Sequence, residues 1–565
     1  MNNEKSYWVV TAQNGLLGGA ISLLLCLIGM VLTFNSSYIV GGIFTMGQAL
    51  AIAPIFLESY RSVQKAPTKN IFNLLAIGGL AGVVGGLILL IAIGLQELIN
   101  IRAILINFSP NLISMLTFKL PLSSGLPTLL VVCLIFGFLS TGLYLLPARI
   151  RGSLLNGLLV VIVLGLFRDL LVTVINLWGV VSKVFLWLFA ENGMTIIGAI
   201  VVFLLVGGFY YWRLGRAGKP NMLVRTPRQQ QMVRWGLIGV LVIIALLIPP
   251  LLGSYFSEIF DQVGIYVLMG LGLNIVVGFA GLLDLGYVAF YAIGAYTLGV
   301  FTTSEAVGLL HLSFWPAAPL AIIVAVFAGV VLGLPVLRMR GDYLAIVTLG
   351  FGEIIRIVVL SDWLKPLLGG SEGIQRIVQP TIGSFIFNNQ QKLYYVIVVG
   401  ILIAGFVVTR LKDSHLGRSW MALREDEDVA QAMGINKVTT KLLAFAMGAL
   451  FSGLGGALFA TKIGSVYPQS FSFIVSINIL SLIIIGGMGS IPGVFIGGFF
   501  LVALPLLLAQ FADFRYLIYG AALVAMMLFK PEGLSPEARR RLELHEEIKE
   551  VLPEEPPTVL NTPGQ

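Results

Sequence analysis

Long apolar runs recur from one end of the chain to the other, separated by short polar or glycine-rich stretches. About sixteen of these runs approach the roughly 18 apolar residues that can cross a hydrocarbon core about 30 Å thick as a helix. Residues 87–95 and 237–248 are apolar on every side, whereas the strands of a membrane β-barrel alternate between apolar and polar residues. The pattern therefore predicts an all-α fold, a polytopic transmembrane helical bundle with broken or re-entrant glycine-rich segments.

The predicted spans cover residues 16–32, 38–57, 74–95, 126–146, a long stretch 154–190, 195–212, 235–252, 263–280, 286–301, 315–337, 343–360, 393–408, 442–464, 473–485, 493–508 and 516–529. Lys and Arg stay on the cytoplasmic side of a membrane, so the basic connectors predict the orientation. Counting crossings from a cytoplasmic N-terminus places every basic connector and both termini inside, provided that residues 154–190 make one net crossing. Arg168 and Asp169 interrupt that stretch and could mark an interfacial bend.

Composition excludes an ordinary soluble enzyme. Hydrophobic residues make up 58% of the chain and charged residues 11%, whereas a soluble protein is about 25% charged. The formal net charge is +8, and the basic stretch at positions 213–234 contains no acid. Topology and anionic lipid headgroups explain basic segments beside membrane spans, so the charge predicts contact with the lipid bilayer and not with nucleic acid.

Charge also divides the chain into parts. We predict an N-terminal transmembrane extension of unknown role (1–212), a basic cytoplasmic linker (213–234), a second transmembrane domain (235–534) and a cytoplasmic C-terminal tail (535–565). Ser535 before Pro536 is a favourable helix start, so a short surface helix to about residue 550 is expected in the tail.

The sequence shows no enzyme signature and no metal-site signature. Cys26 and Cys133 lie in apolar runs, and the three histidines are far apart in the chain. Because no nucleophile–base arrangement or ligand cluster is evident, we expect no catalytic residue, no metal and no cofactor. No G-x-x-x-x-G-K-[S/T] motif occurs, so any ATP that drives this chain must be bound by another subunit.

The glycine-rich segment 273–296 is the first candidate site. Broken helices inside membranes line protein cavities, and glycine permits both non-helical backbone and close helix approach. Asp284 lies beside this break, where a charge is costly, at roughly 2.5 to 3.5 kcal/mol on insertion scales. It could equally be a hydrated turn residue or cap the following helix. The substrate-pathway candidates in this segment are Asn274, Asp284, Gly286 and Tyr287.

Three other segments could contribute to a pathway. Glu353 and Arg356 share one helix face, so they can pair and lower the cost of entering the membrane. Glu353 is the fifth pathway candidate, and an ion pair that only fixes helix packing explains the spacing equally well. A second glycine-rich break at 486–493 separates two apolar runs, and the glycine-rich loop 368–374 is expected on the outside.

The connector at residues 416–434 predicts a docking surface for another protein. One face of a single predicted helix carries Trp420, Leu423, Glu427 and Ala430, with Ala432 and the terminating Gly434 nearby. A solvated loop would not need Trp420, Met421 and Leu423 together, so a surface helix that presents these side chains to a partner is favoured.

Five blocks, taken in order, resemble the permease subunits of branched-chain amino-acid ABC transporters of the LivM type. They are residues 273–296, residues 340–354, the loop 416–434 continuing into 441–458, the break 486–493 and the ending 528–534. The resemblance covers about residues 263–534 and leaves 1–234 without a family. It identifies 235–534 as an ABC permease transmembrane domain.

This resemblance implies an inner-membrane permease subunit of an ATP-driven importer for branched-chain or neutral amino acids. The implied partners are a second permease subunit, two cytoplasmic ATPase subunits and an extracytoplasmic solute-binding protein. Residues 424–434 resemble the ATPase-coupling loop, which adds Arg424 to the docking candidates. The family pattern of Glu-Ala-Ala, three residues and Gly is altered here, because Ala430 and Ala432 are not adjacent and Gly434 follows too soon.

Two other functions stay open at this point. A self-contained secondary transporter could bind a coupling proton or sodium ion at Asp284 or Glu353. An ABC permease for urea or a related small polar solute would share the same resemblance. A membrane-embedded enzyme has little support, because no reactive cluster is evident.

Overall fold

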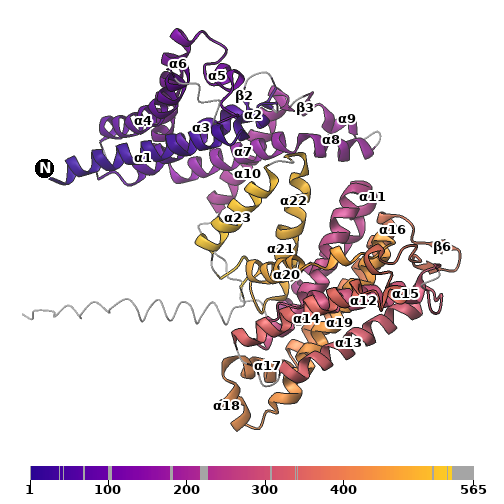
Figure 1. The fold of residues 1–565 in the computed structure, drawn as a ribbon. Helices are drawn as coiled ribbons and strands as arrows, with labels where there is room; N and C mark the ends of the chain where they lie inside the picture. Colours follow the sequence, from indigo (N-terminus) through magenta and orange to yellow (C-terminus); the bar gives the residue numbers. More distant parts are fainter. Residues whose placement is uncertain are drawn as a thin grey trace, which may run out of the picture. The chain divides into compact units, whose positions relative to one another are not determined.

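The computed structural model describes residues 2–36, 38–41, 44–67, 70–98, 105–178, 182–191, 193–216, 227–305, 308–336, 339, 341–511, 514–530 and 532–536. The chain forms two compact units, unit 1 (Met1–Trp235) and unit 2 (Gly236–Gln565) (Figure 1). Linker residues 217–226 and tail residues 537–565, which include most of the predicted tail helix, lie outside the described residues. The predicted roles of the domains stay predictions.

Unit 1 is helical, with one small sheet. Its elements are α1 (Asn2–Leu27), α2 (Met30–Phe34), β1 (Tyr38–Val40), β2 (Phe44–Thr45), α3 (Met46–Gln64), α4 (Ile71–Leu98), α5 (Pro110–Leu116), α6 (Leu122–Leu145), α7 (Ala148–Leu166), α8 (Arg168–Leu177), α9 (Ser182–Leu186), β3 (Phe189–Ala190), β4 (Gly193–Met194) and α10 (Ile196–Arg216). The strand order is β2-β1-β4-β3, and only β1 and β4 are parallel. Helix α1 packs on α3 and α4 through glycines, and a Cβ at Gly19 would lie 2.5 Å from the Gly85 carbonyl oxygen.

Two predicted spans of unit 1 have different bounds in the structure. The span predicted at 38–57 begins with the strands β1 and β2, and α3 starts only at Met46, where Thr45 and Gln48 form a capping box. The long stretch 154–190 is divided between α7, α8, α9 and β3, and α7 ends before Arg168, where a bend was expected. Polar residues interrupt an apolar run and end the helix there.

Unit 2 holds the longer helices. Its elements are α11 (Pro227–Leu273, which begins in unit 1), the π-helix η3 (Asn274–Phe279), α12 (Val288–Thr302), α13 (Phe314–Val336), α14 (Asp342–Leu360), α15 (Lys365–Leu368), η4 (Gly370–Glu372), β5 (Thr381–Ile382), β6 (Phe385–Ile386), α16 (Gln390–Lys412), α17 (His415–Glu425), α18 (Glu427–Ala432), α19 (Lys437–Ile463), η5 (Pro468–Phe471), α20 (Phe473–Gly486), α21 (Ile491–Gly498), η6 (Phe499–Ala503), α22 (Leu504–Leu507), η7 (Leu508–Phe511) and α23 (Arg515–Phe529). Helix α19 packs against both α12 and α13, and its buried residues form much of the core of this unit.

The structure confirms the predicted polytopic helical bundle. In the described part of the chain, ten helices are long and apolar enough to cross a membrane. Four predicted spans correspond to shorter apolar helices, three of them next to a glycine-rich break or a π-helical turn. The predicted spans 235–252 and 263–280 join in α11 and η3, and the only non-helical residue reported inside α11 is Gly253.

The last described residues return to the second glycine-rich break. The backbone N–H groups of Leu534 and Ser535 donate to the carbonyl oxygens of Ile485 and Gly486, at 2.8 and 3.0 Å. Gly533 has φ +91°, and a Cβ there would lie 2.7 Å from Gly487. The chain segment after α23 is therefore bonded to the C-terminal end of α20.

Candidate functional site

The two glycine-rich breaks contact each other inside unit 2. Helix α11 continues into η3, and the backbone then runs without helix to α12. Asn274, the first residue of η3, is fully buried, and its side-chain oxygen accepts a hydrogen bond of 2.8 Å from the N–H of Gly489. A Cβ at Gly278 would lie 2.8 Å from that same nitrogen. Asn274 therefore joins the two breaks, and glycine permits the close approach.

Asp284 lies buried in the turn between η3 and α12. Its Oδ1 accepts a hydrogen bond of 2.9 Å from the Gly286 N–H, and its Oδ2 has no hydrogen-bond partner among the described residues. The neighbouring Leu285 N–H donates to the Thr348 hydroxyl of α14 at 3.0 Å. Because the carboxylate is buried, the structure excludes a hydrated turn residue. The bond to Gly286 lies within the turn, and the N-cap of α12 is Tyr287 without a side-chain cap, so Asp284 does not cap that helix.

Gly286 and Tyr287 fix the start of α12 against two other helices. A Cβ at Gly286 would lie 1.7 Å from the Thr348 carbonyl oxygen, so α14 approaches too closely for any other residue. The Tyr287 hydroxyl is buried and donates to the Gly448 carbonyl of α19 at 2.8 Å. Ser452 of α19 donates in turn to the Tyr287 carbonyl at 3.3 Å.

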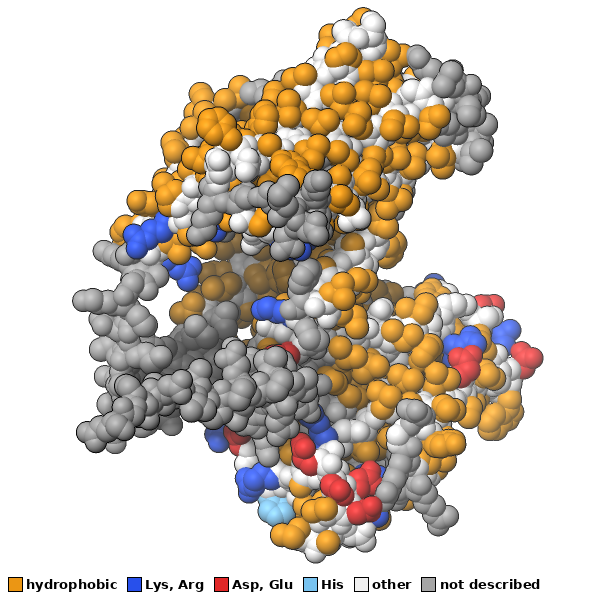
Figure 2. Space-filling view, turned by 90° about the vertical axis from the view of Figure 1, so that its left-hand side faces the viewer, with side chains coloured by type: hydrophobic (Ala, Val, Ile, Leu, Met, Phe, Trp, Pro, Cys, Tyr) orange, Lys and Arg blue, Asp and Glu red, His pale blue; other side chains and the backbone are white. Residues whose placement is uncertain are grey.

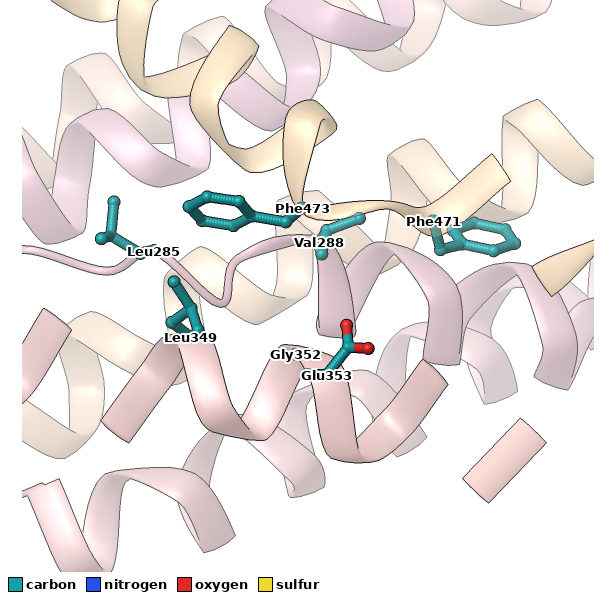
Figure 3. A pocket seen from close by; sticks show the side chains of 7 residues that line it. All are labelled: Leu285, Val288, Leu349, Gly352, Glu353, Phe471 and Phe473. Carbon is teal, nitrogen blue, oxygen red and sulfur yellow. The ribbon is translucent and has the colours of Figure 1, made fainter. Parts of the chain in front are cut away.

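A cavity of about 250 Å³ lies beside this turn, and Glu353 is its charged residue (Figure 3). Its lining residues are Leu285, Val288, Leu349, Gly352, Glu353, Phe471 and Phe473. In Figure 3 the Glu353 carboxylate points from α14 toward Val288. The predicted pairing is present, because Arg356 Nε donates to both Glu353 carboxylate oxygens at 3.0 Å.

Of the five pathway candidates, the structure places only Glu353 in the lining of this cavity. Asn274, Asp284, Gly286 and Tyr287 are packed around the breaks. The cavity has apolar walls and one carboxylate that is already paired with a guanidinium. Such a space suits an aliphatic group, and Glu353 is the charged side chain of its lining.

The predicted docking helix at 416–434 consists of two helices. Asp426 has extended backbone (φ −156°, ψ 116°) and ends α17, while its side chain accepts from the N–H groups of Asp428 and Val429 at the start of α18. The prediction of one continuous helix is therefore wrong. Asp426 is an N-cap in the middle of the connector, and an N-cap residue is not helical.

The expected exposure of Trp420 and Leu423 is also wrong. Both side chains are buried, and the Trp420 indole donates to the Thr440 carbonyl of α19 at 2.9 Å. These side chains hold α17 on unit 2 and do not face outward. Ala430 is buried as well, while Ala432 and Gly434 are exposed. Gly434 has φ +88° and follows α18 at its C-terminal end, as its sequence position predicts.

Two charged contacts fix the connector to the helices beneath it. Arg424 Nη1 of α17 donates to the Gly278 carbonyl of η3 at 2.7 Å. Lys441 of α19, whose side chain is 2% exposed, pairs with Glu427 of α18 at 2.6 Å. Lys441 is not predicted as a partner from the sequence, although a lysine that opens an apolar run is a visible signal.

The outer side of the connector combines apolar and acidic side chains. Val429 and Met433 are 59% and 80% exposed, and Glu425, Asp426 and Asp428 are exposed beside them. Figure 2 shows charged side chains gathered at the lower end of unit 2, where Figure 1 places α17 and α18. This surface, and not Trp420, is what the connector presents outward.

Apolar helices, two joined glycine-rich breaks and a cavity beside them define a multi-pass membrane permease. Comparison with known proteins agrees: residues 255–527 match the family described as the permease component of branched-chain amino acid transport systems. The chain is 39% identical to the LivM permeases of Salmonella typhimurium and Escherichia coli over 327 residues, 54% of this chain and 75% of each relative. It belongs to the branched-chain amino acid transport permease family.

A second group of relatives carries a different name. The high-affinity branched-chain amino acid transport system permease protein LivH of Escherichia coli is 23% identical over 301 residues, 50% of this chain and 95% of LivH. No solved structure matches the chain.

Proposed function

We propose that this chain is the permease subunit of an ATP-driven importer of branched-chain or neutral amino acids. The observation that carries the proposal is the hydrogen bond from Arg424 to the Gly278 carbonyl. It connects the connector that resembles an ATPase-coupling loop directly to the broken helix beside the cavity. A displacement of α17 would therefore be transmitted directly to the glycine-rich break through this hydrogen bond.

The partners follow from the family and from the outer surface of the connector. Two ATPase subunits would bind the exposed side chains of α18, and a solute-binding protein would deliver the solute from the opposite side. The relatives include two permeases of different names, LivM and LivH, which supports a pair of unlike permease subunits. The basic connectors support a cytoplasmic position for both termini and α17, in an inner membrane.

Glu353 is the pathway residue that the cavity supports best. The aromatic and aliphatic walls would accept a branched side chain, and the carboxylate of Glu353 and the guanidinium of Arg356 offer opposite charges to a zwitterion. Asn274, Asp284, Gly286 and Tyr287 would act by holding the breaks in position. Differential ATP binding by the partner subunits would then shift the population between two orientations of these segments.

The test is purification from native membranes, identification of all bound chains by mass spectrometry, and uptake in proteoliposomes. We expect two ATPase subunits and a second permease to copurify, and leucine uptake to require internal ATP and the binding protein. Uptake by the chain alone under a proton or sodium gradient would overturn the proposal in favour of a secondary transporter. Competition with urea would show whether a small polar solute replaces the amino acid.

A further inference from the structure

Two consecutive prolines remove backbone donors from the first half of α11. In an α-helix, the N–H of each residue donates to the carbonyl four residues earlier, and proline has no N–H. Pro249 therefore leaves the Ala245 carbonyl without its helical donor, and Pro250 does the same to Leu246. Gly253 then departs from helical geometry, with φ 79° and ψ −171°. These positions belong to an apolar stretch that is long enough to cross a membrane, and a backbone carbonyl that faces lipid has no water to bond it.

The first turns of α16 supply the missing donors one by one. The Tyr394 hydroxyl donates to the Ala245 carbonyl at 2.9 Å, and the Tyr395 hydroxyl donates to the Leu246 carbonyl at 3.3 Å. Each tyrosine thus bonds the carbonyl that one particular proline leaves open. Adjacent tyrosines on α16 match adjacent prolines on α11 in the same order.

A third side chain of α16 and one of α11 complete the arrangement. Gln391 Nε2 donates to the Pro249 carbonyl at 3.3 Å. On the far side of the break, the buried Ser257 hydroxyl donates to the Gly253 carbonyl at 2.8 Å. Tyrosines are common at membrane interfaces. That general preference does not explain why each hydroxyl bonds the particular carbonyl that a proline leaves without a donor.

We propose that Gln391, Tyr394 and Tyr395 form a clasp that holds the kinked part of α11 in one direction against α16. The part of α11 that the clasp holds lies between residue 236, where unit 2 begins, and residue 255, where the family match begins. It fixes the direction of the part of α11 that precedes the family match within unit 2. This role is independent of which solute the protein carries and of how transport is driven.

The test is a matched set of substitutions in the full-length chain. Tyr394→Phe and Tyr395→Phe are each made in the native background, with Pro249→Ala and with Pro250→Ala. We expect each phenylalanine to lower the melting temperature in lipid nanodiscs by roughly 2 to 4 °C. Pro249→Ala restores the donor for Ala245, so it should abolish the loss for Tyr394→Phe only. Pro250→Ala should abolish the loss for Tyr395→Phe only.

Tyr255→Phe is the control for this set. The Tyr255 hydroxyl donates to the Leu506 carbonyl, which neither Pro249 nor Pro250 affects. Its effect should therefore be the same in all three backgrounds. Equal losses for Tyr394→Phe and Tyr395→Phe in every background, or no loss in the native one, would overturn the clasp.

A second measurement reports the position of α11 relative to α16 and does not depend on stability. Spin labels at the exposed positions Val240 and Val399 report the distance between α11 and α16, and both native cysteines are buried. We expect a narrow distance distribution in the native chain and a broad one when Tyr394→Phe and Tyr395→Phe are combined. An unchanged distribution in that double variant would show that the hydroxyls do not hold the kink.

Discussion

Gly286 shows how a single residue sets the distance between two helices. The Thr348 carbonyl occupies the space that a Cβ at position 286 would need. Helix α14 can therefore approach the turn before α12 only because residue 286 is glycine. Asp284 and Leu285 bond to the same region and depend on that distance. The residue acts through packing, and its effect on transport would be indirect.

Gly286→Ala is therefore expected to destabilise the protein by about 3 kcal/mol or more, because the new methyl group must displace backbone. The matched control is Gly350→Ala on α14, where a Cβ meets nothing within 4 Å. That substitution should be neutral or slightly stabilising, since alanine favours the helix. Thermal unfolding of both purified variants checks the prediction, and equal stability of the two would contradict it.

Arg424→Ala is expected to separate ATP hydrolysis from transport. The substitution removes the donor to the Gly278 carbonyl while Trp420 still holds α17 in place. In the assembled complex, we expect uptake to fall at least about tenfold with ATP hydrolysis retained, which corresponds to about 1.4 kcal/mol. Arg418→Ala is the control, because Arg418 bonds only the nearby Asp413 carbonyl on the exposed side of α17. Normal uptake by Arg424→Ala would rule out this link as the transmission route.

At the scale of elements, the ion pair of Glu427 and Lys441 joins α18 to α19. Lys441 is nearly inaccessible, so Glu427→Gln would leave a buried charge without its carboxylate and cost about 3 to 5 kcal/mol. Adding Lys441→Met should recover most of that loss, because the buried charge is then gone. Asp428→Asn weakens an exposed 3.9 Å pair with Lys437 and should cost less than about 1 kcal/mol. Chemical unfolding of these three variants and the native chain decides whether this order holds.

The sequence specifies the helices of this protein better than it specifies their partners. Apolar runs predict most spans, because a long apolar segment in lipid must be helical. Helical spacing also puts Trp420, Leu423 and Ala430 together. It does not reveal that this chain itself buries them, with Trp420 bonded to α19, since an amphipathic face looks the same whether its own chain or another covers it. The cap at Asp426, which divides the connector, requires knowledge of side-chain geometry.

The local contacts of the candidate site can be predicted from the sequence, and its long-range contacts cannot. The pairing of Glu353 with Arg356 follows from a three-residue spacing on one helix, and the structure shows it. The burial of Asn274 depends on a residue far away in the chain, Gly489, and the turn of Asp284 is bonded to Thr348 of another helix. Long-range contacts of this kind leave no periodic signal in the sequence. Whether these residues line the transport route stays a prediction.

At the scale of the whole molecule, the family match and both glycine-rich breaks lie in unit 2. A chain that starts at Pro227 is therefore expected to reach the membrane and to support ATP-dependent uptake with its partner subunits. The measurement is uptake per amount of membrane-inserted protein, compared with the full-length chain. If the shortened chain inserts normally but transports nothing, unit 1 is required for activity.

The return of the chain after α23 to the end of α20 limits how the protein can be shortened or labelled at that side. Ending the polypeptide before Leu534 would strip two carbonyls of their donors at the very place where the second break begins. A fluorescent reporter or affinity tag should therefore follow residue 536, so that Leu534 and Ser535 continue to donate to the carbonyls at the start of the second break.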